Sequence, residues 1–271
     1  MRLSRFGLLC AAITAVAGCS SEDITNTGLP ALAGVRYINA LADTGRVDVR
    51  MVDQVEWSAT ANNLNFRQGI EHQPTEAKAR HIRVFSFAST NVNVVSQVLV
   101  DTTISFAANT KATLLLTGSA RAGTAHFVVI DDTPPALTAG PTGQIAVRTV
   151  NASTGAIDAY VVTAPADAIT GAPTAANVAV NAASAYVTRT AGNAALRVTN
   201  PGSTTANASA AGPAGSPNPI GAPGTYFPSA GVNNGGSAFS VYYFPAGVAG
   251  SLQAAVTTPG IVWFVDQVPT S

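Results

Sequence analysis

Short apolar stretches, separated by Gly, Pro, Asn and Ser, recur along the chain from residue 34 onward. Within 46–52, Val47, Val49 and Met51 alternate with charged residues, the pattern of a strand with one buried face. The continuous apolar runs in "KATLLLTG" and "HFVVID" are typical of strands covered on both sides. The pattern predicts strands at 35–40, 46–52, 80–87, 92–100, 112–117, 125–131, 145–151, 157–163, 194–199, 239–244, 252–257 and 261–265. No window sustains a long helical period, so we expect an all-β protein.

The apolar pattern occurs twice. "VRYINA" at 35–40 corresponds to "VRTVNA" at 147–152. Three further blocks follow in the same order: 47–49 with 157–159, 82–84 with 196–198, and 129–131 with 264–266. The offset grows from 114 at Arg83/Arg197 to 135 at Asp131/Asp266, so the second copy has 135 − 114 = 21 additional residues between these points. Four blocks in one order indicate a tandem duplication.

The duplication predicts the domain organisation. We expect two tandem antiparallel β-sandwich domains of immunoglobulin-like type after a lipoprotein signal peptide. The predicted segments are a signal peptide (1–18), a lipidated tether (19–33), a first domain (34–134), a linker (135–143) and a second domain (144–271). A Pro/Gly/Ala/Ser/Asn-rich stretch near 200–238 is expected to be a long loop of the second domain.

The repeated blocks resemble a known family. "VRYINA…VDV" and "VRTVNAS…IDAYV", with "AANTKATLLLTG" and "FVVIDD", are similar to the domain of unknown function 4397 family over most of the chain. The resemblance implies an extracellular β-sandwich, found in tandem copies in bacterial envelope proteins that are often lipoproteins, with no established activity. The Pro-rich turn that follows Asn-Ala in the family is replaced here by "LAD" at 41–43 and "STG" at 153–155.

The N-terminus predicts the location. Arg2 and Arg5 precede an apolar run at 6–17, which is too short to span a bilayer and reads as a secretory signal. "VAGC", ending at Cys19, resembles the lipobox of bacterial lipoproteins, in which the cysteine is acylated. By the same resemblance, the absence of Asp after Cys19 favours the outer membrane. The alternative is an ordinary signal peptide that contains a cysteine.

Composition excludes several classes of protein. Cleavage before Cys19 leaves 271 − 18 = 253 residues with 12 basic and 14 acidic side chains, a net charge of −2. No basic cluster suggests a nucleic-acid partner. Charged residues make up only 10% and hydrophobic residues 47%, as in a chain with a sizeable core. The other cysteine, Cys10, lies in the signal peptide, so the mature chain is expected to have neither a disulfide nor a thiolate metal site.

Candidate catalytic groups are sparse. His72, His81 and His126 lack the spacing of a metal pair, and no nucleophile-elbow motif occurs. We therefore predict no catalytic residue, no metal and no cofactor. A Ca²⁺ site at Asp131 and Asp132 is a weaker alternative, because oxygen ligands suit this ion.

Two repeated polar pairs remain. Arg36 with Asp48, and Arg148 with Asp158, lie on consecutive predicted strands. We interpret them as cross-strand ion pairs that set the strand register; the alternative is a polar site present in both domains. In the long loop, the aromatic residues at 226–227, Tyr226 and Phe227, are a candidate contact for a glycan or a protein, or else a cover for a sheet edge.

These patterns favour a non-enzymatic cell-envelope protein, bound to the bacterial outer membrane through its N-terminal lipid. Its two domains would serve binding, adhesion or structure, with an unknown glycan or protein partner. One alternative is an accessory subunit of an envelope assembly. The other is a polysaccharide-acting enzyme that uses carboxylates such as Asp43, Asp48 or Glu56.

Overall fold

The computed structural model describes residues 28–54, 61–86, 97–140, 142–215 and 229–269. Residues 31–271 form one compact unit. Every regular element in the described ranges is a β-strand, which confirms the predicted all-β class. No helix in these ranges is long and apolar enough to cross a membrane.

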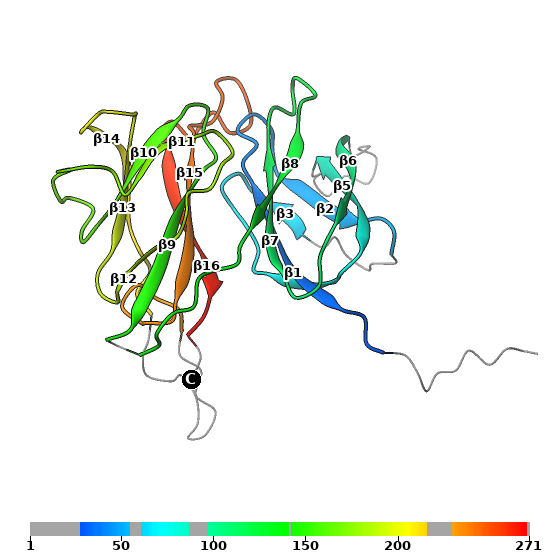
Figure 1. The fold of residues 1–271 in the computed structure, drawn as a ribbon. Coiled ribbons are helices and arrows are strands. Elements are labelled where there is room, and N and C mark those ends of the chain that lie inside the picture. Colours follow the sequence, from blue (N-terminus) through cyan, green and yellow to red (C-terminus); the bar gives the residue numbers. More distant parts are fainter. Residues whose placement is uncertain (1–27, 55–60, 87–96, 141, 216–228, 270–271) are drawn as a thin grey trace, which may run out of the picture. The chain divides into compact units, whose positions relative to one another are not determined.

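The described residues contain sixteen strands (Figure 1). The first eight are β1 (Leu32–Asn39), β2 (Val47–Met51), β3 (Ala61–Leu64), β4 (Gln73–Glu76), β5 (Ala79–Ser86), β6 (Val98–Ser105), β7 (Lys111–Thr117) and β8 (His126–Asp131). The second eight are β9 (Gln144–Asn151), β10 (Ile157–Val162), β11 (Ala175–Val178), β12 (Val187–Thr190), β13 (Ala195–Thr199), β14 (Ala206–Ala211), β15 (Ala238–Phe244) and β16 (Gly260–Gln267).

Strands β1–β8 make two four-stranded sheets, in the orders β4-β1-β7-β8 and β3-β2-β5-β6. The core between them is built from alternate residues of facing strands, such as Val35 and Leu114 from one sheet and Val49 and Ile82 from the other. Val47, Val49 and Met51 are all buried, as the alternation predicted. We call this half of the protein the first sandwich.

Strands β9–β16 repeat the same arrangement, with sheets in the orders β12-β9-β15-β16 and β11-β10-β13-β14. Each strand thus has a counterpart eight places earlier in the chain, and we call this half the second sandwich. One pair in each sandwich is parallel, β1 with β7 and β9 with β15, so the sheets are not wholly antiparallel as expected. In each sandwich the chain passes through the opposite sheet before it returns, so that β7 runs beside β1, and β15 beside β9, in the same direction.

Two predicted features are wrong. Residues 252–257 lie in the turns between β15 and β16, where Leu252 is largely exposed and has no neighbouring strand to pair with. The expected long loop near 200–238 contains β14, which pairs with β13. In the described part of this stretch that begins at residue 229, Val232 is buried. Short Ala, Asn and Ser strands carry little intrinsic β signal, because an adjacent strand supplies most of their stability.

The strand boundaries also differ from the expectation. β3, β4, β11 and β12 were not predicted either, for the same reason: each is only four residues long and lacks a run of large apolar residues. The strand expected at 92–100 appears as β6, which begins at Val98; residues 92–96 lie outside the described ranges.

A third apolar cluster joins the two sandwiches. Its buried members include Ile38, Leu115 and Ile130 from the first sandwich and Val150, Tyr242 and Phe244 from the second. On β7, Leu114 and Leu116 face the core of the first sandwich, whereas Leu115 faces the second sandwich. The "LLL" run is therefore buried on both sides, as predicted, and the β4-β1-β7-β8 and β12-β9-β15-β16 sheets pack against each other.

Candidate functional site

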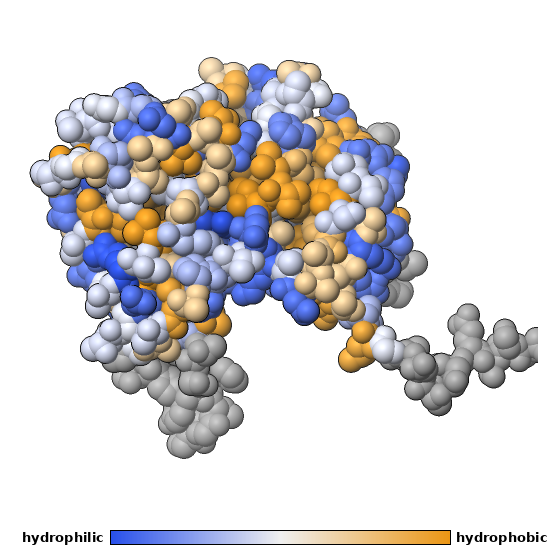
Figure 2. All heavy atoms as spheres, in the orientation of Figure 1, coloured by the Kyte–Doolittle hydropathy of each residue, from blue (hydrophilic) through white to orange (hydrophobic). Residues whose placement is uncertain are grey.

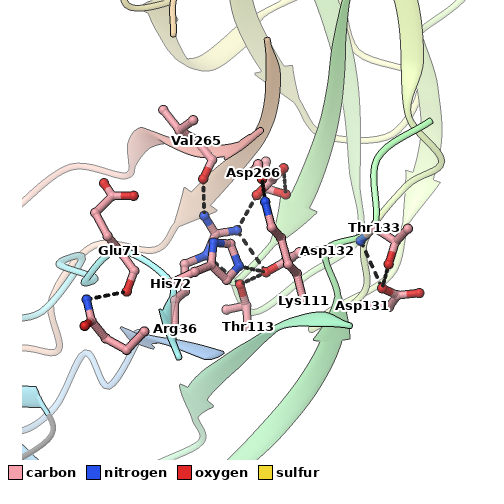
Figure 3. A network of polar contacts seen from close by, with 12 residues as sticks. Arg36, Glu71, His72, Lys111, Thr113, Asp131, Asp132, Thr133, Val265 and Asp266 are labelled. Atoms are coloured by element: carbon pink, nitrogen blue, oxygen red, sulfur yellow. Dashed lines mark hydrogen bonds and ion pairs between the residues drawn. The ribbon is translucent and has the colours of Figure 1, made fainter. Parts of the chain in front are cut away.

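A buried arginine on β1 reaches from the first sandwich into the second (Figure 3). The Nη2 atom of Arg36 donates to Oδ1 of Asp266 at 2.5 Å and lies 3.2 Å from Oδ2 of Asp132. Its Nη1 donates to the carbonyl oxygen of Val265 at 3.1 Å, and its Nε to the hydroxyl of Thr113 at 2.6 Å. All of the nitrogens of this guanidinium therefore have acceptors.

Arg148 on β9 makes the same set of contacts in the opposite direction. Its Nε donates to the hydroxyl of Ser240 at 2.8 Å, its Nη1 to the carbonyl oxygen of Asp131 at 2.6 Å, and its Nη2 to Oδ1 of Asp132. Ser240 lies opposite Arg148 in the parallel β9–β15 ladder, as Thr113 lies opposite Arg36 in the β1–β7 ladder. Each arginine thus pairs with a carboxylate of the other sandwich, the reciprocity expected of a two-fold related interface.

The two carboxylates are held from their own sandwich as well. Asp132 accepts from Thr113 at 2.5 Å and lies 2.9 Å from Nε2 of His72. Asp266 accepts from Ser240 at 2.7 Å and from the hydroxyl of Tyr186 at 2.8 Å. We call Arg36, Arg148, Asp132 and Asp266, which carry two positive and two negative charges, the arginine–aspartate network.

Burial and charge act against each other in this network. Burial alone would raise the pKa of Asp132, but the hydrogen bond to His72, the charge of Arg36 and the hydroxyl of Thr113 outweigh it and lower the pKa. Burial alone would lower the pKa of Arg36, but the acidic groups around it, Asp132 and Asp266 among them, raise it. Asp132 and Arg36 thus keep their charges at neutral pH although their side chains are at most 1% exposed.

This geometry suits a structural role. Each carboxylate has hydroxyl and guanidinium donors, and the charges balance, so the network meets the conditions for burying ions at low cost. In the described ranges, no three His, Cys, Asp or Glu side chains gather in the way that would hold a metal ion. The network therefore joins the two sandwiches and leaves no acceptor directed at a substrate.

The predicted partners of the two arginines are wrong. Arg36 and Asp48 lie on β1 and β2, which belong to opposite sheets of the first sandwich, and Arg148 and Asp158 are separated in the same way. β1 and β2, like β9 and β10, are therefore consecutive in the chain but are not neighbours in a ladder. Asp48 instead accepts the main-chain N–H of Asn63 at 2.7 Å.

Asp158 has the equivalent role in the second sandwich. It accepts the N–H of Asn177 at 2.8 Å and that of Gly202 at 2.8 Å. Asn63 and Asn177 both have positive φ, 58° and 49°. The repeated Asp of each copy therefore supports a positive-φ residue within an edge strand, β3 or β11.

The internal alignment was shifted by one residue at its last block. It paired Asp131 with Asp266, whereas the structural counterpart of Asp266 is Asp132. The Asp131 side chain is exposed and accepts from Thr133, and Asp132 is fully buried. Adjacent residues of a strand face opposite sides, so a shift of one position exchanges the buried and exposed aspartates. Both oxygens of Asp132 contact partners inside the interface, so Asp131 and Asp132 do not present a pair of carboxylates to one Ca²⁺ ion.

The remaining sequence candidates lie elsewhere. Asp43 accepts from the hydroxyl of Ser119 at 2.5 Å and from two N–H groups of the 118–124 loop. Burial would raise the pKa of Asp43, but these hydrogen bonds lower it. His81 pairs with Asp101 at the surface, and His126 contacts the carbonyl oxygen of Thr124. Cys19, Glu56, Tyr226 and Phe227 lie outside the described ranges.

A cleft of about 700 Å³ lies at one end of the interface between the sandwiches. The first sandwich contributes residues 40–43 and the 117–124 loop. The second contributes residues 152–154, 180–181 and the start of the β15–β16 connection. Sequence reasoning did not anticipate this cleft, because its walls come from five separate segments.

Sequence reasoning also missed most of the network. It singled out Arg36 and Arg148, but not the hydroxyls of Thr113 and Ser240 or the phenol of Tyr186. A signal was present: Thr113 and Ser240 are small hydroxyl residues within mainly apolar strands, at matching places in the two copies.

These features define a class: an all-β protein made of two topologically equivalent sandwiches that are joined by reciprocal buried ion pairs. The sequence comparison agrees. Residues 33–162 match the family model described as "Domain of unknown function (DUF4397)", which confirms for this segment the resemblance that the repeated blocks indicated. The matched segment runs from β1 through β10. No curated protein matches the chain.

Proposed function

We propose that this protein is a non-enzymatic, lipid-anchored component of the bacterial outer membrane whose two sandwiches act together as one binding or structural module. The arginine–aspartate network carries this proposal. Its partners come from both sandwiches and are almost completely buried, so separating the sandwiches would expose unpaired charges. A module built in this way holds a fixed geometry, as a spacer or a binding surface requires.

The lipid anchor is proposed from Cys19 and the lipobox-like "VAGC". Acyl chains on one cysteine would hold the protein at the membrane, and more than one chain is needed for stable attachment. Twelve residues, 20–31, separate Cys19 from Leu32, where the first strand begins.

The absence of an enzymatic role is proposed from the state of the candidate carboxylates. Both oxygens of Asp43 accept hydrogen bonds that hold the 118–124 loop. Asp48 accepts from the main chain of Asn63. Carboxylates whose oxygens accept such structural hydrogen bonds are poor general acids, and those bonds also lower the pKa of Asp43.

Labelling of cells with a palmitate analogue tests the anchor, with Cys19→Ala as the comparison. We expect label on the wild type and none on Cys19→Ala. Protease treatment of intact cells then distinguishes a surface-facing protein, which is cleaved, from a periplasmic one, which is protected. Equal labelling of the two proteins, or none on either, would refute the anchor.

A second candidate function is an accessory subunit of an envelope assembly. It is favoured by β8, which is an edge strand with a half-exposed Val129. Figure 2 shows apolar surface where β8 lies in Figure 1. A photo-crosslinking residue at Val129 should capture a single partner protein in cells if this function is correct, whereas the same residue at the exposed Arg50 should not.

A further inference from the structure

The cleft between the sandwiches exists because the two-fold relation of the interface is broken at one place. Residues 67 and 181 are counterparts: Arg67 donates its N–H to the carbonyl of Asn39, and Asn181 donates its N–H to the carbonyl of Asn151. Both have positive φ, 66° and 60°. The residues before them, Phe66 and Val180, are therefore counterparts too, and the strand registers make Thr117 the counterpart of Phe244.

On one side of the interface these positions are filled. Phe66 packs edge-on against Phe244, with 6.2 Å between the ring centroids. Arg67 covers the Phe66 ring at 5.0 Å and donates to the carbonyl oxygens of Pro245 and Thr258, both at 2.5 Å. Two aromatic rings and a guanidinium thus close this side.

On the other side the same positions hold small residues. Val180, Asn181 and Thr117 line the cleft, and Asn181 bonds only across to the Thr117 hydroxyl at 3.0 Å, besides its main-chain contacts. Val180 stands where the opposite side has Phe66, Thr117 where it has Phe244, and Asn181 where it has Arg67. The groups that close the opposite side are therefore missing here. The volume of about 700 Å³ that results is within the range of small-molecule sites, which often lie at domain interfaces.

The walls of the cleft are mainly apolar. Ala40, Ala122 and Ala152 contribute to them, and Val180 and Val248 remain 41% and 45% exposed there. Such exposed aliphatic side chains in a hollow gain from being covered by an aliphatic group. No aromatic side chain lies among the described lining residues, so the stacking surface that sugars and bases use is missing.

The charge in the cleft is asymmetric. Among the described lining residues, Asp43 and Arg121 are the charged ones. Asp43 is buried and its oxygens are taken by the 118–124 loop. Arg121 is exposed and uses one nitrogen on the carbonyl of Gly250, which leaves further N–H donors for a ligand.

We propose that this cleft binds an anionic amphiphile, a molecule with a single aliphatic chain and a carboxylate or similar acidic head. The chain lies against Val180, Val248 and the alanines, and Arg121 pairs with the head group. This proposal rests on the binding role proposed above and specifies the chemical class of the ligand.

Calorimetric titration of the purified full chain tests the proposal. The chain carries Cys19→Ala, so that no acyl anchor competes, and failure here leaves the anchoring proposal untouched. The probes are dodecanoate and dodecyltrimethylammonium below their micelle concentrations. We expect one molecule of dodecanoate per chain and at least about tenfold weaker binding of the cation, the effect of one charge-assisted hydrogen bond.

Three variants locate the site. Arg121→Gln should reduce the preference for dodecanoate to near zero. Val180→Phe combined with Asn181→Arg introduces the residues that close the opposite side and should abolish binding. Val98→Phe, at a 46% exposed position on β6, is the matched control and should bind as the parent does.

If the double variant does not fold, Val248→Trp blocks the cleft from its exposed rim instead. The proposal is overturned if neither probe binds, if the cation binds as well as dodecanoate, or if the closed variants bind like the parent.

Discussion

Replacing Asp132 by Asn removes one negative charge from the buried network while keeping the size and shape of the side chain. In the wild type, Arg36 and Arg148 are balanced by Asp132 and Asp266. The variant leaves two guanidinium groups with a single carboxylate. Because Asp132 is fully buried, water cannot replace the lost charge. We therefore expect a large loss of stability although only one carboxylate oxygen is replaced, by an amide nitrogen.

The magnitude follows from the burial. Removing one partner of a buried ion pair costs about 3–5 kcal/mol of folding free energy. Against a typical unfolding free energy of about 5–15 kcal/mol, this is about a fifth or more of the total. For a domain of this size, each kcal/mol lowers the unfolding temperature by about 2–4 °C, so Asp132→Asn should unfold about 6–20 °C below the wild type.

Urea unfolding followed by circular dichroism measures the effect. Asp131→Asn is the matched control, because Asp131 is the adjacent residue, is exposed, and bonds only Thr133 through its side chain. We expect the control to stay within about 0.5 kcal/mol of the wild type. A larger loss for Asp131→Asn than for Asp132→Asn would show that the sequence-based register was correct and that the network is misplaced.

The same variant predicts a change in acid stability. The pKa of Asp132 is lowered in the folded state, so its contribution to stability is present above the pKa of an unfolded aspartate, about 3.9, and is lost as the pH falls further through the folded value. The wild type should therefore lose stability below about pH 4 more steeply than Asp132→Asn does. Urea unfolding curves of both proteins at pH 3, 4 and 7 measure the difference. If the unfolding free energies of the two proteins changed equally with pH, the lowered pKa of Asp132 would be refuted.

Two further predictions concern the interior. Gly69→Ala places a methyl group 2.6 Å from the ring of Phe264 and 2.9 Å from Ile38, so it should destabilise the protein by about 1–3 kcal/mol in urea unfolding, and an unchanged midpoint would contradict this packing. Asp158→Ala removes the acceptor for the N–H of Asn177, a β11 residue with positive φ, with an expected loss of about 1–3 kcal/mol. Asp167→Ala, at a surface turn, is the control for this second variant, and equal losses for the two would argue against a special role of Asp158.

Much of the fold could be predicted from local patterns. The alternation at 46–52 predicted the buried face of β2, and the run "LLL" predicted that β7 is covered on both sides. The short, alanine-rich strands β11 and β14 could not be found in this way, because most of their stability comes from pairing with β10 and β13. The prediction of a strand at 252–257 was wrong for the converse reason: apolar residues form no strand when no neighbouring strand pairs with them.

The candidate site was less accessible to sequence reasoning. Arg36 and Arg148 stood out because they recur at matching places, yet their partners could not be inferred. The acids chosen from the sequence, Asp48 and Asp158, lie in the opposite sheets, and the true partner of Arg36, Asp266, is 230 residues away. Local pattern carries no information about contacts at such a separation.

The sequence by itself determined the all-β class, the two copies of one domain, the family and the segments that repeat, since hydrophobic period and repetition are properties of neighbouring residues. Only the tertiary structure decided which aspartate is buried, which arginine pairs with it and where the cleft opens. These depend on how two sheet faces meet, and there a shift of one residue turns a side chain from solvent into the interface. The substitutions from Phe66 to Val180 and from Arg67 to Asn181 are visible in the sequence, but they gain meaning only when the two sandwiches are placed face to face.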